Sequence, residues 1–126
     1  MKAPDGRPIF LNLMKIQLPI TGIVSFAHRI SGILLFLAIP YLAYIFDLSL
    51  QGPDGFAAVV TQLTSPYLKP VIFLLFWSLL HHLLSGIRFL LIDIDVFVDK
   101  QAAQLSANIV FYAGILLSVV FVVANL

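Results

Sequence analysis

The stretch LLHHLLSGIR, residues Leu79–Arg88, decides the fold, because it carries two histidines and an arginine within a segment apolar enough to cross a bilayer. Ionisable side chains inside a membrane-spanning segment are costly and rare, so by default they indicate function. At helical spacing, one face carries four residues of this region: His82, Gly86, Phe89 and Asp93. The stretch therefore predicts a membrane-spanning helix with a functional face.

The composition of the whole chain indicates a membrane protein. Of its 126 residues, 61% are hydrophobic and 10% are charged, whereas soluble domains carry about 25% charged residues. A spanning helix needs roughly 20 mostly apolar residues, so we predict an all-α integral membrane protein with three transmembrane helices. The single membrane-anchor domain, 1–126, divides into a cytoplasmic surface segment (1–21) and spans at 22–46, 67–92 and 105–126, with a short interfacial helix expected within 56–64.

The basic residues predict the orientation of these helices, because lysine and arginine gather on the cytoplasmic side of a membrane. The chain places them at Lys2, Arg7, Lys15 and Arg29 before or at the start of the first span, at Arg88 and Lys100 at the end of the second, and at Lys69 on the other side. We therefore expect a cytoplasmic amino terminus and a carboxyl terminus outside. The candidate functional residues then share the cytoplasmic half: His28, Arg29, His82, Arg88 and Asp93.

Several function classes are excluded or disfavoured by composition. The chain has no cysteine, so it forms no disulfide and holds no iron–sulfur cluster by itself. Its net charge of +1 gives no support to nucleic-acid binding. Ionisable residues cluster at one end instead of forming a path through the membrane, which disfavours a transporter or channel. Three helices make a poor core for a large cofactor, so partner subunits are expected.

The imidazole of His82 is the first candidate for cofactor binding. Gly86, one helical turn away, leaves room for a flat cofactor, and haem iron ligated by histidine is the obvious choice. His81 points about 100° away from His82 and lines up with Ser85 and Arg88 instead, although a shifted register would exchange the two histidines. A second haem ligand is compatible either with His28 or with a partner subunit. The alternative is a histidine that simply hydrogen-bonds a neighbouring helix.

A hydroxyl and a guanidinium near the start of the first span suit a quinone headgroup. Ser25 is able to donate a hydrogen bond to a quinone carbonyl, and Arg29 supplies positive field for the negative charge that develops on reduction. His28 and Arg29 are also suited to meet a haem propionate at a helix end. The competing interpretations are a serine bonded back to its own helix and an arginine that extends to the lipid headgroups.

These motifs resemble a known family, the cytochrome b556 membrane-anchor subunits of bacterial succinate dehydrogenase. The resemblance covers nearly the full length and is carried by Arg7-Pro8, Pro19-Ile20-Thr21, SFAHRISG at Ser25–Gly32, the loop Pro53–Phe56, and HLLSGIR at His82–Arg88 followed by Asp93. The second of the two long motifs is similar to the family's haem motif, H-x-x-x-G-x-R with a downstream aspartate. One departure is Phe89, where the family often has histidine, and it removes one possible propionate partner.

The resemblance implies an oxidoreductase complex in the bacterial inner membrane, with a flavoprotein, an iron–sulfur protein and a second small anchor as partners. It implies that His82 ligates haem b, that the other ligand comes from the second anchor, and that Ser25 and Arg29 belong to the ubiquinone site. His28, Arg29 and Gly86 would lie near the haem, with less certain roles for Asp93, His81 and Arg88. The chain alone would not be an enzyme. The alternatives are the anchor of a fumarate reductase and a structural anchor without a cofactor.

Overall fold

The computed structural model describes residues 17–125, and within them the chain is helical throughout, without strands. Four helices follow one another: α1 (Ile20–Ser49), α2 (Pro53–Leu63), α3 (Lys69–Asp93) and α4 (Lys100–Asn125). Three of them, α1, α3 and α4, are long and apolar enough to span a membrane. The prediction of an all-α chain with three spanning helices is therefore confirmed. Most of the predicted surface segment, residues 1–16, lies outside the described residues.

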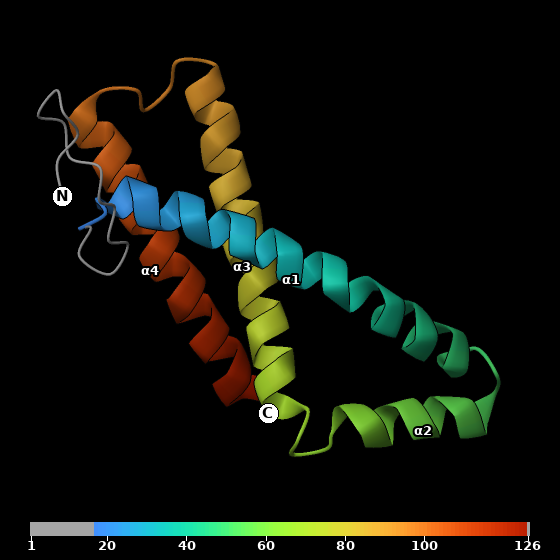
Figure 1. The fold of residues 1–126 in the computed structure, drawn as a ribbon. Coiled ribbons are helices and arrows are strands. Elements are labelled where there is room, and N and C mark those ends of the chain that lie inside the picture. Colours follow the sequence, from blue (N-terminus) through green and yellow to red (C-terminus); the bar gives the residue numbers. More distant parts are fainter. Residues whose placement is uncertain (1–16, 126) are drawn as a thin grey trace, which may run out of the picture.

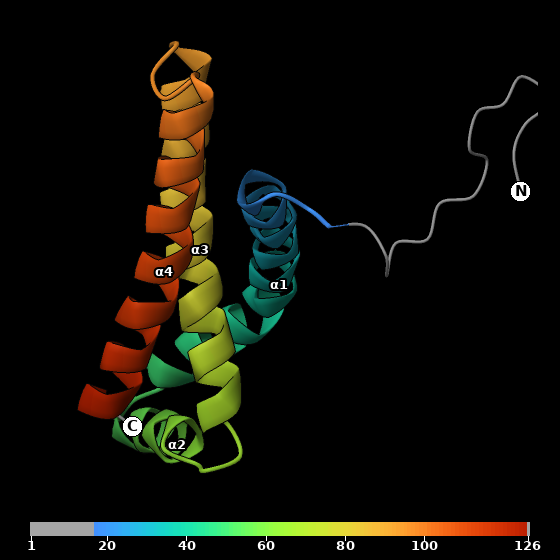
Figure 2. The ribbon, with the colours of Figure 1, turned by 90° about the vertical axis from the view of Figure 1, so that its left-hand side faces the viewer.

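The helices form an open bundle in which α3 and α4 run antiparallel and α1 crosses them (Figure 1). Seen from the side, α3 and α4 lie together while α1 packs against one face of the pair (Figure 2). The short helix α2 lies across the end of the bundle where α1 finishes and α3 begins. The end of α3 and the start of α4 meet at the opposite end from α2 (Figure 1). The start of α1 packs below this end, where Val24 lies against Ala107 and Val110 of α4.

Proline, glycine and a capping aspartate set the helix boundaries. Helix α1 starts after Pro19, whose backbone is extended, and α2 begins with Pro53, after Gly52 at φ 102°, a conformation that suits glycine. At α4, the carboxylate Oδ1 of Asp99 accepts hydrogen bonds from the backbone N–H groups of Gln101 and Ala102 at 3.1 and 3.0 Å. These contacts satisfy N–H groups that a helix start leaves unpaired. All three spanning helices extend beyond the predicted spans at their amino-terminal or carboxyl-terminal ends.

The packing places small and polar side chains inside and large apolar ones outside. The fully buried residues include four serines, Ser31, Ser78, Ser85 and Ser118. The outward positions of α1, α3 and α4 are occupied by exposed leucine, isoleucine, valine and phenylalanine side chains. Small residues let helix backbones approach closely within a bilayer, where lipid solvates the large apolar side chains. This arrangement is typical of a membrane protein.

Candidate functional site

His82 lies where α3 crosses α1, and its imidazole rests against the backbone of α1. Its Nδ1 atom is 3.1 Å from the carbonyl oxygen of His28 and 3.3 Å from the hydroxyl oxygen of Ser31. Its ring also stacks on the ring of His28, with centroids 4.2 Å apart and planes inclined by 11°. These three contacts hold the Nδ1 edge and one face of the ring, and the side chain as a whole is half-buried.

The contact with His28 determines the protonation of the His82 ring. A carbonyl oxygen only accepts hydrogen bonds, so the proton of the neutral ring sits on Nδ1. The other nitrogen, Nε2, then carries a free lone pair. It has no hydrogen-bond partner within residues 17–125 and is not among the enclosed polar atoms. An imidazole with Nδ1–H on a backbone carbonyl and an open Nε2 is the usual arrangement of a metal-ligating histidine.

Two glycines flank the paired histidine rings. A Cβ atom built on Gly32 of α1 would lie 2.9 Å from Cε1 of His82, closer than real Cβ contacts allow. A Cβ atom built on Gly86 would lie 3.7 Å from Nε2 of His28, an ordinary contact. The ring of His28 therefore occupies the space beside Gly86, and the absence of a side chain at Gly32 lets the ring of His82 approach α1.

His81 points about 100° away from His82, into the bundle, where it is fully buried. Its Nε2 atom lies 3.4 Å from the carbonyl oxygen of Val24 and 3.2 Å from the hydroxyl oxygen of Ser85. Trp77 stacks on its ring, with centroids 5.2 Å apart. Its Nδ1 atom is enclosed without a hydrogen-bond partner in the described part of the chain. His81 thus joins α1 to α3 from inside the bundle and has no open nitrogen.

Arg88 is directed into the contact between α3 and α4. It is only 5% exposed, and it donates from Nε to the hydroxyl of Ser106 at 2.9 Å and from an Nη atom to the carbonyl of Ala103 at 3.0 Å. Its guanidinium also lies 5.6 Å from the ring centre of Phe89, whose edge meets His28 at 5.2 Å. Arg88 is therefore in contact with the His28–His82 pair only through Phe89.

Ser25, Arg29 and Asp93 lie near the same end of the bundle, without side-chain contacts to the histidine pair. Ser25 is half-buried, whereas Arg29 and Asp93 are exposed. None of the three makes a side-chain hydrogen bond or an ion pair with another residue in the range 17–125. The polar groups of these three residues are therefore not used in packing this part of the chain.

Sequence reasoning assigned no role to Ser31 and Gly32, although both lie in the motif SFAHRISG. Their contacts depend on the point where α1 crosses α3, which residue spacing does not reveal. The sequence did contain one indication of these contacts, a Ser-Gly pair inside an apolar span. Small residues at such positions let two helices approach each other closely. Ser106, the partner of Arg88, lies in the third predicted span and was likewise assigned no role.

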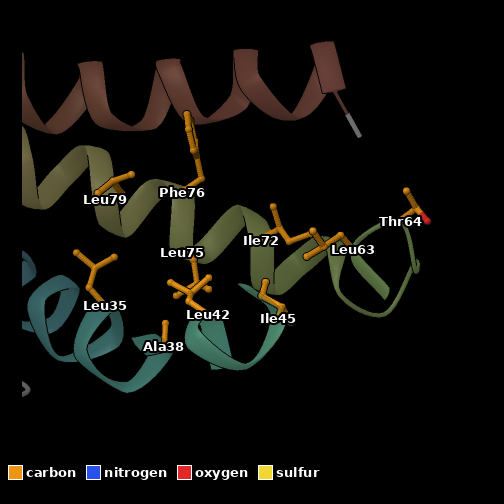
Figure 3. Close-up of a pocket in the computed structure, with 10 residues that line it drawn as sticks. All are labelled: Leu35, Ala38, Leu42, Ile45, Leu63, Thr64, Ile72, Leu75, Phe76 and Leu79. Atoms are coloured by element: carbon orange, nitrogen blue, oxygen red, sulfur yellow. The ribbon is translucent and has the colours of Figure 1, made fainter. Parts of the chain in front are cut away.

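An apolar cavity lies away from these residues, toward the α2 end of the bundle (Figure 3). It has a volume of about 560 Å³. Its lining is almost wholly apolar and comes from α1 (Leu35, Ala38, Leu42, Ile45), the end of α2 (Leu63, Thr64) and α3 (Ile72, Leu75, Phe76, Leu79). No titratable side chain lines it, and within the described residues no group of three or more histidine, aspartate, glutamate or cysteine side chains is placed to hold a metal ion. Candidate chemistry therefore rests on single side chains, above all on His82.

The fold and the packing define a multi-pass membrane protein with three spanning helices. Residues 3–121 match the family described as "Succinate dehydrogenase/Fumarate reductase transmembrane subunit", and the chain belongs to this family. It is similar to the "Succinate dehydrogenase cytochrome b556 subunit" of Coxiella burnetii, with 31% identity over 106 residues that cover 83% of this chain and 85% of that protein. The resemblance found in the sequence motifs is thereby confirmed. Membership implies association with the membrane and with the other subunits of an oxidoreductase complex.

Proposed function

We propose that this chain is the haem-b-binding membrane anchor of a succinate:quinone oxidoreductase and forms part of its ubiquinone-reduction site. The observation that supports this most directly is the state of His82, whose Nδ1 proton is engaged by the His28 carbonyl at 3.1 Å while Nε2 is open. Haem b, when bound, supplies a one-electron redox centre whose potential depends on its ligands and their surroundings. The donor chemistry of His82 fits this group.

The second axial ligand belongs to the partner anchor in this proposal. His28 is the histidine whose ring contacts that of His82, and the two rings are stacked at 11°. Two ligands of one iron must direct a nitrogen at the metal from opposite sides, which face-to-face rings do not do. His28 instead supports His82 through its carbonyl and its ring, and together with Arg29 it faces the region suited to a propionate.

Ser25 and Arg29 provide the contribution of this chain to the quinone site. Their side chains have no hydrogen-bond partners in residues 17–125 and lie within one turn of each other on α1. The Ser25 hydroxyl donates to a quinone carbonyl, and the Arg29 guanidinium stabilises the negative charge that develops as electrons arrive. Asp93, exposed at the end of α3, is the nearest candidate for receiving protons from the cytoplasm.

The complex that contains this chain is placed in the bacterial inner membrane, with a flavoprotein, an iron–sulfur protein and a second small anchor. The carboxyl terminus is periplasmic, because six of the seven basic residues lie near the opposite end of the spans. A reporter enzyme fused after Leu126 should be active in the periplasm. Activity of a cytoplasmic reporter at that position would reverse the orientation and would move Ser25 and Arg29 away from the iron–sulfur subunit.

The decisive experiment is a dithionite-reduced minus oxidised spectrum of the purified complex, with wild type beside His82→Ala. A b-type band should be present in the wild type and absent in the variant, while succinate oxidation with a water-soluble electron acceptor should continue in both. An unchanged band in His82→Ala would remove this residue as the ligand. A wild type without a band would leave a cofactor-free anchor, the alternative function.

A further inference from the structure

We propose that Ser31 and Gly32 of α1 are positioning residues for His82, and that together they set the strength with which His82 binds haem and the haem midpoint potential. This inference rests on the proposed function, because it assumes that His82 is the ligand. The proposal is based on the close approach of α1 to the Nδ1 edge of the His82 ring. The proposed ligand atom is Nε2, so the Nδ1 edge is free to contact α1.

Among the glycines of the described chain, Gly32 leaves the least room between its helix and a histidine ring. A methyl group at Gly32 would lie 2.9 Å from Cε1 and 3.3 Å from Nδ1 of His82. The atoms that would have to yield belong to the end of a side chain, so the helices need not separate and the ring itself would move by several tenths of an ångström. Because Nδ1 is on the displaced edge, its hydrogen bond to the His28 carbonyl would lengthen.

Gly114 provides an internal comparison. It also faces a histidine of α3 from a neighbouring helix, yet a methyl group there would lie 3.6 Å from Nδ1 of His81, an ordinary van der Waals contact. The two glycines share the same type of environment and differ in the room they leave. Gly32 therefore restricts the histidine beside it, and Gly114 does not.

Ser31 acts on the same nitrogen through hydrogen bonds. Its hydroxyl is fully buried, donates to the carbonyl of His28 at 2.8 Å, and presents its oxygen to Nδ1 of His82 at 3.3 Å. The Nδ1–H group thus has two acceptors, the His28 carbonyl and the Ser31 hydroxyl. Ser118 is an equally buried serine that donates to the carbonyl of Gly114, within its own helix, at 2.7 Å, and it makes no hydrogen bond to a histidine in the described chain.

The effect on a bound iron follows from the basicity of the imidazole. Hydrogen bonds from Nδ1–H make the ring a stronger donor at Nε2 and fix its tautomer and orientation, and loss of such partners typically lowers metal affinity by roughly 10- to 100-fold. A less basic ligand stabilises the oxidised iron less, so the midpoint potential rises. Both Gly32→Ala and Ser31→Ala weaken these hydrogen bonds and are expected to act in the same direction.

The test uses the intact purified complex and measures haem content per flavin and the haem midpoint potential by optical redox titration. Gly32→Ala should shift the potential upward and lower haem retention on dilution, while Gly114→Ala should leave both at wild-type values. Equal shifts in the two variants would assign the effect to general helix packing and would overturn the proposal, as would an unchanged Gly32→Ala complex.

The serine pair gives a second measurement that avoids added bulk. Ser31→Ala should raise the midpoint potential, Ser31→Thr should restore it, and Ser118→Ala should not change it. Wild-type potential in Ser31→Ala would remove Ser31 from the proposal, and an upward shift in Ser118→Ala would show that any buried hydroxyl has this effect. The ligand assignment is tested separately, by loss of the b-type band in His82→Ala. If that band is lost but the midpoint potential is unchanged in Gly32→Ala and Ser31→Ala, only the positioning role is contradicted.

Discussion

His81 and His82 are neighbours in sequence and lie in opposite environments. His81 is enclosed between the helices, with its Nε2 atom near Val24 and Ser85 and no nitrogen open to a ligand. His82 is half-buried, with one nitrogen bonded to α1 and the other open. The difference arises because successive helix residues point about 100° apart.

In this pair, deep burial and an open ring nitrogen fall on different histidines. The more deeply buried residue is the one whose polar atoms are used for helix packing. The ligand candidate lies at the edge of the three-helix unit, where a partner anchor is able to complete the site.

Among the substitutions that test the difference between His81 and His82, His81→Ala is expected to have the largest effect. Removal of a fully buried ring creates a cavity and leaves its partners unpaired, which should cost about 2–4 kcal/mol of stability. The thermal midpoint of the detergent-solubilised complex should fall, while the b-type band of the folded fraction keeps its wild-type intensity per flavin. Loss of the band from the folded fraction would instead assign the ligand role to His81.

An intermediate effect is expected on the quinone side. Ser25→Ala and Arg29→Leu remove groups that form no hydrogen bond with His81 or His82, and they leave the ligand candidate His82 in place, so the b-type band should be retained in both variants. Ubiquinone reduction should fall about tenfold, equivalent to about 1.4 kcal/mol of transition-state stabilisation, and succinate oxidation with an artificial acceptor serves as the control. Wild-type quinone kinetics in both variants would exclude these residues from the site.

The smallest effect is expected for Asp99→Ala, far from either histidine. It removes the cap that accepts the N–H groups of Gln101 and Ala102, and such a loss typically costs about 1 kcal/mol. The thermal midpoint should decrease slightly, and both the spectrum and quinone reduction should be unchanged. Asp99→Asn, which preserves the capping oxygen, should behave as wild type. A change in the spectrum would mean that distant helix stability also affects His82, which would weaken the distinction between the two histidines.

The sequence predicted the number of spanning helices because long apolar runs bounded by proline and polar residues have few alternatives in a bilayer. Helical spacing also separated the His81 face from the His82 face. The contacts of His82 with Ser31 and Gly32 were not predictable, because they depend on the crossing point of two helices separated by about 50 positions in the chain. The inward direction of Arg88 likewise depends on the register between α3 and α4, although its alignment with His81 was already visible in the spacing.

The capping role of Asp99 was missed for a different reason. The third span was predicted to begin at residue 105, whereas α4 begins at Lys100, and an aspartate directly before a helix is a strong helix-start signal. The loop before α4 holds Asp95 and Phe97 at φ 62° and 64°. Few residues other than glycine adopt this conformation, and nothing in the sequence pattern indicates it.

The placement of serines inside and large apolar residues outside determines which substitutions the chain tolerates. On the outward faces of the spans, one bulky apolar residue is able to replace another at little cost, because lipid adapts to its shape. At Ser31, Ser78, Ser85 and Ser118, which are fully enclosed, only side chains of similar size fit. Natural variation in such a chain should therefore be greatest at the hydrophobic positions, the reverse of the pattern in a water-soluble protein, where the apolar core varies least.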